Sequence, residues 1–278
     1  MKLGYTVWTW LSDEHRDWRR VEDPKAGVEQ ALREISHLGY QTVENFNWFA
    51  DFYEDNPAEV TDLMKKYGLE FVNIYHYLTP DFNADLKNGE RYAAFGEKIG
   101  ASYMNLQMQT WKDMPYDRPF NKEAIEEYSR KANLIGKIAK EHGLTVCVHP
   151  HANTPVFTVD QITYFLQCTD PELVSLCLDT GHIALSGGDP VKAFEMFIER
   201  TAYVHLKDLD PDTSAHTEWP MKRFCALGQG CIDFKGVFKV LKEHQFNGVV
   251  CVELDYQKVC HYESAMFSRN YLKDVIGI

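Results

Sequence analysis

The stretch KEAIEEYSRKANLIGKIAKEHGLTVCVHPH, residues 122–151, shows the unit from which the chain is built. Its apolar residues up to His142 return at helical spacing, which indicates an amphipathic helix. Gly143 then offers the left-handed conformation that commonly ends a helix. The next run, LTVCVH, has the length and apolar character of a buried strand, and histidines follow it at positions 149 and 151. We therefore predict a helix followed by a parallel strand.

The same unit recurs along the whole chain. Apolar runs of strand length occur eight times, at LGYTVW, QTVENF, EFVNIYHY, SYMNLQMQ, LTVCVH, VSLCLD, AYVHLK and VVCVELD, with amphipathic segments between them. Eight such units in 278 residues match a closed (β/α)₈ barrel, for which ~250 residues is typical. An open doubly wound sheet is the competing arrangement, but no GxGxxG or GxxxxGK[ST] loop follows the first strand. We predict an α/β fold, a TIM barrel that forms a single domain over residues 1–278.

The composition excludes several classes of protein. No apolar run approaches the ~18 to 20 residues of a membrane span, and no long apolar stretch marks a secretory signal, so we expect a cytoplasmic protein without a membrane partner. The formal net charge of −12 repels polyanions and argues against nucleic acid as a partner. Seven cysteines without a CxxC pair are typical of reduced thiols packed in a core. A homo-oligomer and a monomer both remain open.

In a TIM barrel the active site lies where strands end and the following loops begin. The polar residues at these predicted ends are Glu44, His76, Gln107, Gln109, His149, His151, Asp179, His182, His205, Lys207, Glu253 and Asp255. Residues two apart share one face of a strand. On the last four strands the candidates for metal binding thereby share a face with Cys147, Cys177, Tyr203 and Cys251. The opposite face is aliphatic, which distinguishes the inside of the barrel from the side that meets the helices.

Four of these residues have the side chains of a metal site. The imidazoles of His149 and His205 and the carboxylates of Asp179 and Glu253 carry a net charge of about −2, which balances a divalent cation. Without a cation the two buried carboxylates would face each other at a high cost in free energy. We therefore expect these four residues to bind one divalent metal ion. We expect Glu44 and Lys207 either to pair with each other or to contact substrate.

The motifs around these residues point to a known family. At CLDTGH (177–182), YVHLKD (203–208), LGQG (227–230) and VCVELD (250–255), the sequence resembles the xylose isomerase-like TIM-barrel superfamily of sugar isomerases, epimerases and lyases. The likeness covers nearly the whole chain and is strongest from Thr145 onward. It implies one divalent ion held at the ends of strands five to eight, here by His149, Asp179, His205 and Glu253, with His182 as a substrate contact.

The HPH motif departs from the pattern of most epimerases in this superfamily, which place glutamate at the end of strand five. The branch that resembles inosose dehydratase also carries histidines there. The resemblance implies that a histidine replaces the glutamate ligand, and the sequence leaves open whether His149 or His151 does so. Contact between the ion and substrate oxygens requires five or six ligands, which favours Mn²⁺ or Co²⁺, with Mg²⁺, Fe²⁺ and Zn²⁺ as alternatives.

The histidines also affect the expected reaction. With Glu253 as the remaining carboxylate base and His149, His151 or His182 available for proton transfer, the residues favour a lyase, or dehydratase. The resemblance implies a keto-sugar or keto-inositol as its substrate. The alternative is an isomerase or epimerase, of the ketose 3-epimerase or hydroxypyruvate isomerase type, in which a histidine serves as the second base. More remote alternatives are an abasic-site endonuclease, which the net charge opposes, and a sugar-binding protein without catalysis.

The expected substrate is a small carbohydrate or cyclitol. The residues that we expect to contact it are Glu44, His76, Gln107, His182, Lys207 and Trp8. Aromatic rings suit the apolar faces of sugars, and the predicted rim also contains Phe46, Trp48, Tyr75, Tyr77, Trp111, Tyr116, Phe157 and Trp219. No glycine-rich phosphate cradle or arginine cluster accompanies strands seven and eight, which favours a neutral polyol over a sugar phosphate.

Overall fold

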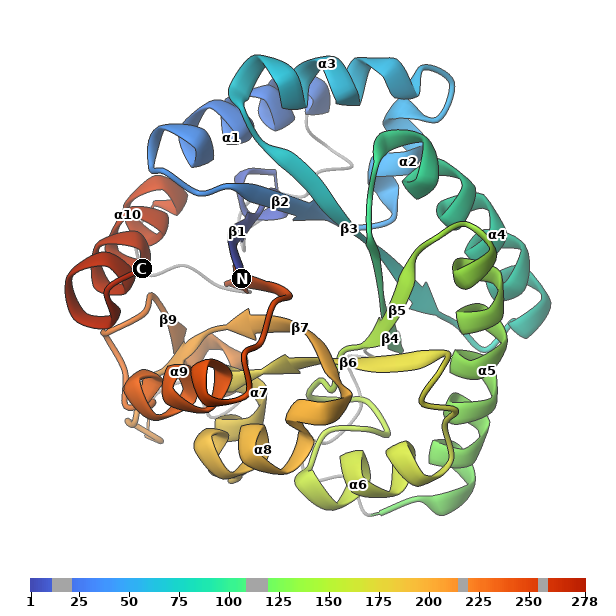
Figure 1. The fold of residues 1–278 in the computed structure, drawn as a ribbon, viewed down its shortest axis with the longest axis vertical. Helices are drawn as coiled ribbons and strands as arrows, with labels where there is room; N and C mark the ends of the chain where they lie inside the picture. The colour runs from blue at the N-terminus through green and yellow to red at the C-terminus, as the bar shows by residue number, and fades with distance from the viewer. Residues whose placement is uncertain (12–21, 109–119, 215–219, 255–259) are drawn as a thin grey trace.

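A computed structural model describes residues 1–11, 22–108, 120–214, 220–254 and 260–278. Within these residues, eight parallel strands close into a barrel in the order β1-β10-β7-β6-β5-β4-β3-β2, surrounded by helices (Figure 1). The barrel strands are β1 (Lys2–Thr6), β2 (Thr42–Asn45), β3 (Glu70–Leu78), β4 (Tyr103–Met108), β5 (Thr145–Val148), β6 (Val174–Asp179), β7 (Thr201–Leu206) and β10 (Val249–Val252). The prediction of a TIM barrel is confirmed.

Helices follow the strands in chain order and form the outer ring. They are α1 (Pro24–His37), α2 (Trp48–Tyr53), α3 (Pro57–Tyr67), α4 (Phe82–Ile99), α5 (Lys122–Glu141), α6 (Val159–Gln167), α7 (Thr180–Leu185), α8 (Pro190–Phe197), α9 (Phe234–Glu243) and α10 (His261–Tyr271). Short 3₁₀ segments lie at Trp8–Trp10, Ile198–Arg200 and Pro220–Arg223, and a π-helical turn at Leu272–Ile276. After β7, a small antiparallel pair joins β8 (Asp208–Leu209) to β9 (Phe224–Cys225).

The ends of the helices are set by local sequence. Asp23 caps α1 and Asn121 caps α5, since each side chain accepts a hydrogen bond from a backbone amide three residues on, at 3.0 Å. Gly68 and Gly100 end α3 and α4 with φ of +64° and +80°, a conformation that costs other residues more. These signals determine where the helices begin and end, and so where the connection to the next strand starts.

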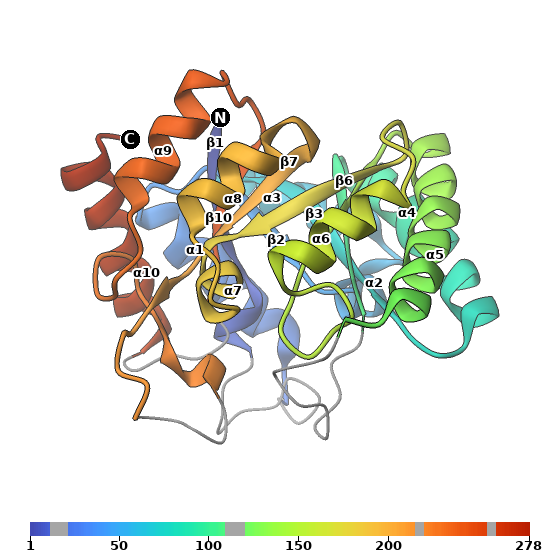
Figure 2. The same ribbon diagram turned by 90° about the horizontal axis from the view of Figure 1, so that it is seen from below.

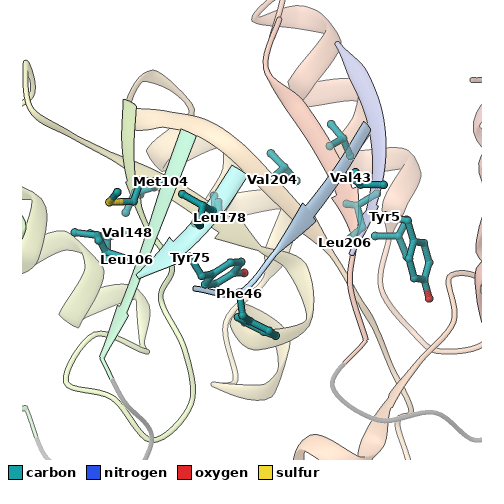
Figure 3. Packing of buried hydrophobic residues seen from close by; sticks show 14 of the residues in the cluster. Tyr5, Val43, Phe46, Tyr75, Met104, Leu106, Val148, Leu178, Val204 and Leu206 are labelled. Carbon is teal, nitrogen blue, oxygen red and sulfur yellow. The ribbon is translucent and has the colours of Figure 1, made fainter. Parts of the chain in front are cut away.

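The two faces of the barrel strands differ as predicted. Cys147, Cys177, Tyr203 and Cys251 form a small buried cluster of their own. The alternating residues on the same strands belong to the large core between the barrel and the helices, where Figure 3 shows Val148, Leu178, Val204 and Leu206. The prediction of a largely thiol-lined interior face and an aliphatic outer face is confirmed.

Parallel strands bring all their carboxyl ends to one end of the barrel. In the side view of Figure 2, β1 starts next to the N-terminus at one end, whereas α7, which follows β6, lies toward the other. Among the helices of the described residues, none combines the length and the apolar character that crossing a membrane requires.

Candidate metal centre

Four buried side chains meet at the carboxyl end of the barrel. His149 directly follows β5, Asp179 ends β6, His205 lies near the end of β7, and Glu253 directly follows β10. One potential ligand atom from each residue lies within 4.8 Å of all the others. None of the four residues is more than 2% exposed. We refer to this set as the four-residue cluster.

His149, and not His151, belongs to the cluster. The Nε2 atom of His149 lies 3.3 Å from Asp179 Oδ2, and its Nδ1 atom lies 3.1 Å from Gln107 Oε1. Because an amide oxygen only accepts, Nδ1 carries the proton and the Nε2 lone pair faces the cluster. Gln107 therefore holds the His149 ring, and its contact with substrate stays a prediction. Of the two histidines of the HPH motif, His149 is the one whose ring lies in the cluster.

Asp179 and Lys207 add charges at the centre of the site. Asp179 Oδ1 accepts a hydrogen bond from the His182 amide at 2.8 Å, which caps α7 and leaves Oδ2 to face the cluster. Lys207 Nζ lies 3.1 Å from that Oδ2 and 2.6 Å from Glu253 Oε2. The lysine is fully buried and neutralises part of the cluster's negative charge.

His205 lies between two carboxylates. Its Nδ1 atom is 3.0 Å from Glu253 Oε2, and its Nε2 atom is 3.0 Å from Glu44 Oε1. The ring of Tyr75 stacks on the imidazole, with centroids 6.0 Å apart and planes inclined by 25°. Asn73 donates to the other Glu44 oxygen at 2.9 Å. Glu44 thus contacts His205, whereas Lys207 lies against Asp179 and Glu253. A contact between Glu44 and substrate stays a prediction.

The electrostatics keep the carboxylates ionised. Burial alone would raise the pKa of Asp179, but the charge of Lys207 and the neighbouring histidines outweigh it and hold that pKa well below its usual value. Burial likewise opposes ionisation of Glu253, yet Lys207 and His205 hold its pKa below the usual range. Burial lowers the pKa of His151 to about 3, so that this ring is neutral at physiological pH.

A second pair of histidines lies beside the cluster. The rings of His151 and His182 are 3.8 Å apart between centroids. His151 Nδ1 contacts the carbonyl oxygen of Ala152 at 2.7 Å and must donate its proton there, which leaves Nε2 as an acceptor. His182 Nδ1 accepts from the Ala152 amide at 3.3 Å, and its Nε2 lies 3.3 Å from Lys207 Nζ. The pair therefore offers polar ring atoms next to the four-residue cluster.

The structure places His76 away from this site. Its Nε2 atom donates to the backbone oxygen of Asp85 at 2.8 Å, and its ring packs edge-on against Tyr92 of α4. The preceding residue, Tyr75, is the one that contacts His205. The side chain of His76 therefore lies on the helix-facing side of β3, and its contact with substrate stays a prediction.

The predicted aromatic rim is seen in part. Trp8 packs against Phe46 at 5.2 Å between ring centroids, and Phe46 packs against Tyr75 at 4.7 Å (Figure 3). This row of rings leads from the half-buried Trp8 to the ring that covers His205, and Trp8 remains our candidate for a substrate contact. Of the other residues expected at the strand ends or rim, five lie outside the described residues: Gln109, Trp111, Tyr116, Trp219 and Asp255.

One structural role was not predicted from the sequence. The buried carboxylate of Asp208 accepts backbone hydrogen bonds from Gly228 and Gly230, each at 2.9 Å, and from Ile232 at 3.1 Å. A Cβ atom at Gly230 would lie 2.4 Å from the Asp208 carboxylate, so only glycine fits this approach. The HLKD and LGQG motifs therefore belong to one loop assembly beside the site. The acid after Lys207 and the spaced glycines were the signal available.

The donor set of the cluster fits a divalent cation. Two imidazole nitrogens and two carboxylates converge with their lone pairs directed inward, and both histidines have hydrogen-bond partners on the ring nitrogen that faces away. Mixed nitrogen and oxygen ligands suit Mn²⁺, Co²⁺, Fe²⁺ or Zn²⁺. A second group, Glu44, His205 and Cys251, also has ligand atoms within 4.8 Å of one another, and it shares His205 with the first.

Comparisons with known proteins agree with this architecture. A family model described as xylose isomerase-like TIM barrel matches residues 32–272. A curated relative from Clostridium tetani, named inosose dehydratase, is 34% identical, with 83% of this chain and 76% of the relative aligned. The fold matches the IOLI protein with a bound zinc atom, at a TM-score of 0.76 and 18% identity over 99% of this chain and 98% of that one. It also matches a Methylomonas sp. D-allulose 3-epimerase in complex with D-allulose, at a TM-score of 0.76 and 17% identity over 99% and 96%.

Proposed function

We propose that this chain, which belongs to the xylose isomerase-like TIM-barrel family, is a metal-dependent dehydratase acting on a keto-inositol or a related keto-sugar. The observation that carries the proposal is the convergence of His149, Asp179, His205 and Glu253 at the carboxyl end of the barrel. The relative named inosose dehydratase supports the reaction and the substrate class.

The four-residue cluster would hold one divalent ion, with Mn²⁺ or Co²⁺ preferred. We assign the ligand atoms to Nε2 of His149, Nδ1 of His205, and a carboxylate oxygen each of Asp179 and Glu253. A bound ion supplies Lewis acidity to the carbonyl oxygen of the substrate, which lowers the pKa of the adjacent C–H bond. The IOLI protein, which has the same fold, is described with a bound zinc atom, and this supports a metal-binding role for the cluster.

An elimination needs one group that takes a proton from carbon and another that gives a proton to the leaving hydroxyl, and residues of the site can supply both. Glu253 would take the proton from the carbon next to the carbonyl, and the electrons of that C–H bond form the new C=C bond. The C–O bond of the β-hydroxyl breaks, and the oxygen leaves as water with a proton from the Lys207–His182 pair. His151, with Nε2 as an acceptor, would orient a substrate hydroxyl. Where the α carbon of the substrate carries a hydroxyl, as in a polyhydroxy ketone, the new C=C bond makes that hydroxyl an enol, which tautomerises to a second ketone.

The decisive experiment combines metal replacement with one substitution. The protein is stripped with EDTA, reloaded with Mn²⁺ or Co²⁺, and incubated with keto-inositols and 3-keto-sugars in D₂O. We expect loss of water with metal only, and a fall in kcat of about 10²-fold or more for Glu253→Gln, with an unchanged circular dichroism spectrum. Glu70→Gln, the same change at an exposed position on β3, is the matched control and should retain full activity. Normal turnover by Glu253→Gln would remove Glu253 as the base.

A ketose epimerase is the second candidate. The structural match to D-allulose 3-epimerase favours it, and His151 Nε2 could act as the second base beside Glu253. The same D₂O experiment separates the two reactions. An epimerase would place deuterium in the substrate and its epimer without losing water, whereas a dehydratase forms a product lighter by one water. Binding of sugars without any exchange, unaffected by chelator, would indicate a sugar-binding protein instead.

A further inference from the structure

Glu44 reaches His205 through the interior of the barrel. It lies on β2 and His205 on β7, with β1 and β10 between these strands, and the closed barrel brings the two residues together across 161 positions of sequence. Both oxygens of Glu44 are near Nε2 of the imidazole, at 3.0 and 3.2 Å. Both residues are fully buried. This contact therefore forms inside the protein, away from bulk water.

Glu44 is itself held in place by two consecutive hydrogen bonds that involve amide groups. Asn73 Nδ2 donates to Glu44 Oε2 at 2.9 Å, and Asn73 Oδ1 accepts from the backbone amide of Asn105 at 2.9 Å. The second bond fixes which end of the Asn73 amide faces Glu44. These bonds span β2, β3 and β4, so the position of the carboxylate is set by the barrel wall.

A carboxylate at Nε2 determines what the other ring nitrogen can do. An ionised carboxylate only accepts hydrogen bonds, so Nε2 of His205 carries a proton that it donates to Glu44. When the ring binds an ion, the other nitrogen, Nδ1, supplies the lone pair; Nδ1 faces Glu253 at 3.0 Å. An anionic partner also makes the ring more electron-rich than a neutral partner would.

We propose that Glu44 is a positioning residue that orients His205 and strengthens it as a metal ligand through Nε2. The inference rests on the proposed function, because it concerns the same ion. Gln107 has the equivalent place behind His149, at 3.1 Å from Nδ1. The two histidine ligands thus differ: His149 is supported by a neutral amide and His205 by a charge. The competing arrangement is a second ion held by Glu44, His205 and Cys251.

The test uses Co²⁺ as the probe and Glu44→Gln as the variant, since glutamine keeps the volume and removes the charge. Cobalt affinity is measured by competition with a chelator, and the number of bound ions by elemental analysis. We expect an affinity lower by about 10- to 100-fold, with one ion per chain in both proteins and unchanged urea unfolding of the metal-free forms. Glu70→Gln, the same change on the exposed start of β3, should bind cobalt like the wild type.

Two results would overturn the proposal. One is unchanged cobalt affinity in folded Glu44→Gln; the other is two ions in the wild type and one in the variant, which would make Glu44 a ligand. A readout independent of affinity is the ¹⁵N spectrum of the histidine rings in the zinc-loaded wild type, where we expect His205 to be protonated at Nε2. Protonation at Nδ1 would also contradict the proposal.

The same spectra separate this inference from the proposed function. If the wild type binds no ion, the proposal of a metal-dependent function fails. The role of Glu44 is then tested by comparing the ring spectra of the metal-free wild type and metal-free Glu44→Gln. An Nε2–H resonance of His205 that is lost or shifted in Glu44→Gln retains Glu44 as the residue that orients the ring. Identical ring spectra in the two proteins would remove it.

Discussion

Lys207 Nζ lies 2.6 Å from Glu253 Oε2, and neither side chain is more than 2% exposed. The same ammonium lies 3.1 Å from Asp179 Oδ2, so one buried cation serves two buried carboxylates. Bringing such charges out of water is costly unless each is paired. A divalent ion in the four-residue cluster would supply positive charge at the same carboxylates. Lys207 is therefore the internal counter-ion of the metal-free site.

Replacing this counter-ion should have an effect that depends on the metal. Without metal, Lys207→Met leaves Asp179 and Glu253 uncompensated, and we expect a loss of about 3–5 kcal/mol in the free energy of unfolding. With saturating Co²⁺ the loss should be much smaller, because the ion pairs with the same carboxylates. Urea unfolding with EDTA and with Co²⁺ measures both values. Lys2→Met, in an exposed pair with Glu70, is the control and should change stability by only about 0–1 kcal/mol in either condition. An equal loss with and without Co²⁺ would refute this role.

A substitution of His76 tests whether this side chain has a structural role or contacts substrate. Its Nε2 donates to the Asp85 backbone oxygen at 2.8 Å, behind β3, which gives the side chain a structural role. We expect His76→Leu to reduce the free energy of unfolding by about 1–3 kcal/mol, because it leaves that buried oxygen without its donor. The kcat/KM of the residual folded protein should stay within a factor of two of the wild type. A large fall in kcat/KM at unchanged stability would return His76 to the site.

The fold and the four-residue cluster were accessible from sequence because both depend on local periodicity. Apolar runs, glycines after helices and the alternation of strand faces act over a few residues, and the closed barrel then brings the ends of consecutive strands together. His149, Asp179, His205 and Glu253 each occupy such an end. No long-range information was needed to place them at one end of the barrel.

The features that the sequence did not predict are not local. In the strand EFVNIYHYL one face carries Phe71, Asn73, Tyr75 and Tyr77, and the other carries Val72, Ile74, His76 and Leu78. Each face mixes apolar and polar residues, so the sequence does not tell whether Tyr75 or His76 faces inward, and the β2–β3 register is irregular between Val43 and Glu44. The contact of Glu44 with His205 runs through the interior of the closed barrel, past β1 and β10. The role of Asp208 depends on a loop that returns twenty residues later. Such contacts are set by tertiary geometry.

Asp208 gives the next prediction. Its carboxylate accepts from the amides of Leu209, Gly228, Gly230 and Ile232. In Asp208→Asn an NH₂ group must face some of these donors, and we expect a loss of about 2–4 kcal/mol in the free energy of unfolding, measured in urea. Asp212→Asn makes the same change at an exposed turn, and its effect should be within about 0.5 kcal/mol. Equal stability of the two variants would show that the loop does not depend on the Asp208 charge.

His142 gives a prediction about pH, because its ring lies between two carboxylates of α4. Nδ1 is 2.7 Å from Glu97 Oε2 and Nε2 is 3.0 Å from Glu90 Oε1, and these bonds raise the pKa of the histidine. A pKa raised on folding adds stability that is full below the unfolded value of about 6.5 and disappears as pH rises through the folded value. We expect His142→Gln to lose about 0.2–1 kcal/mol at pH 6 and progressively less toward pH 9, where the wild-type ring is also neutral.

Urea unfolding of the wild type and His142→Gln at pH 6, 7.5 and 9 measures this dependence. His244→Gln is the matched control, since that ring contacts Glu199 at 3.3 Å and is more exposed, 43% against 19% for His142. Its effect should be smaller at every pH, because water screens an exposed pair. The reverse trend, with the loss for His142→Gln growing toward pH 9, would mean that the ring stabilises the fold in its neutral form, and the two carboxylates would then have no part in its contribution.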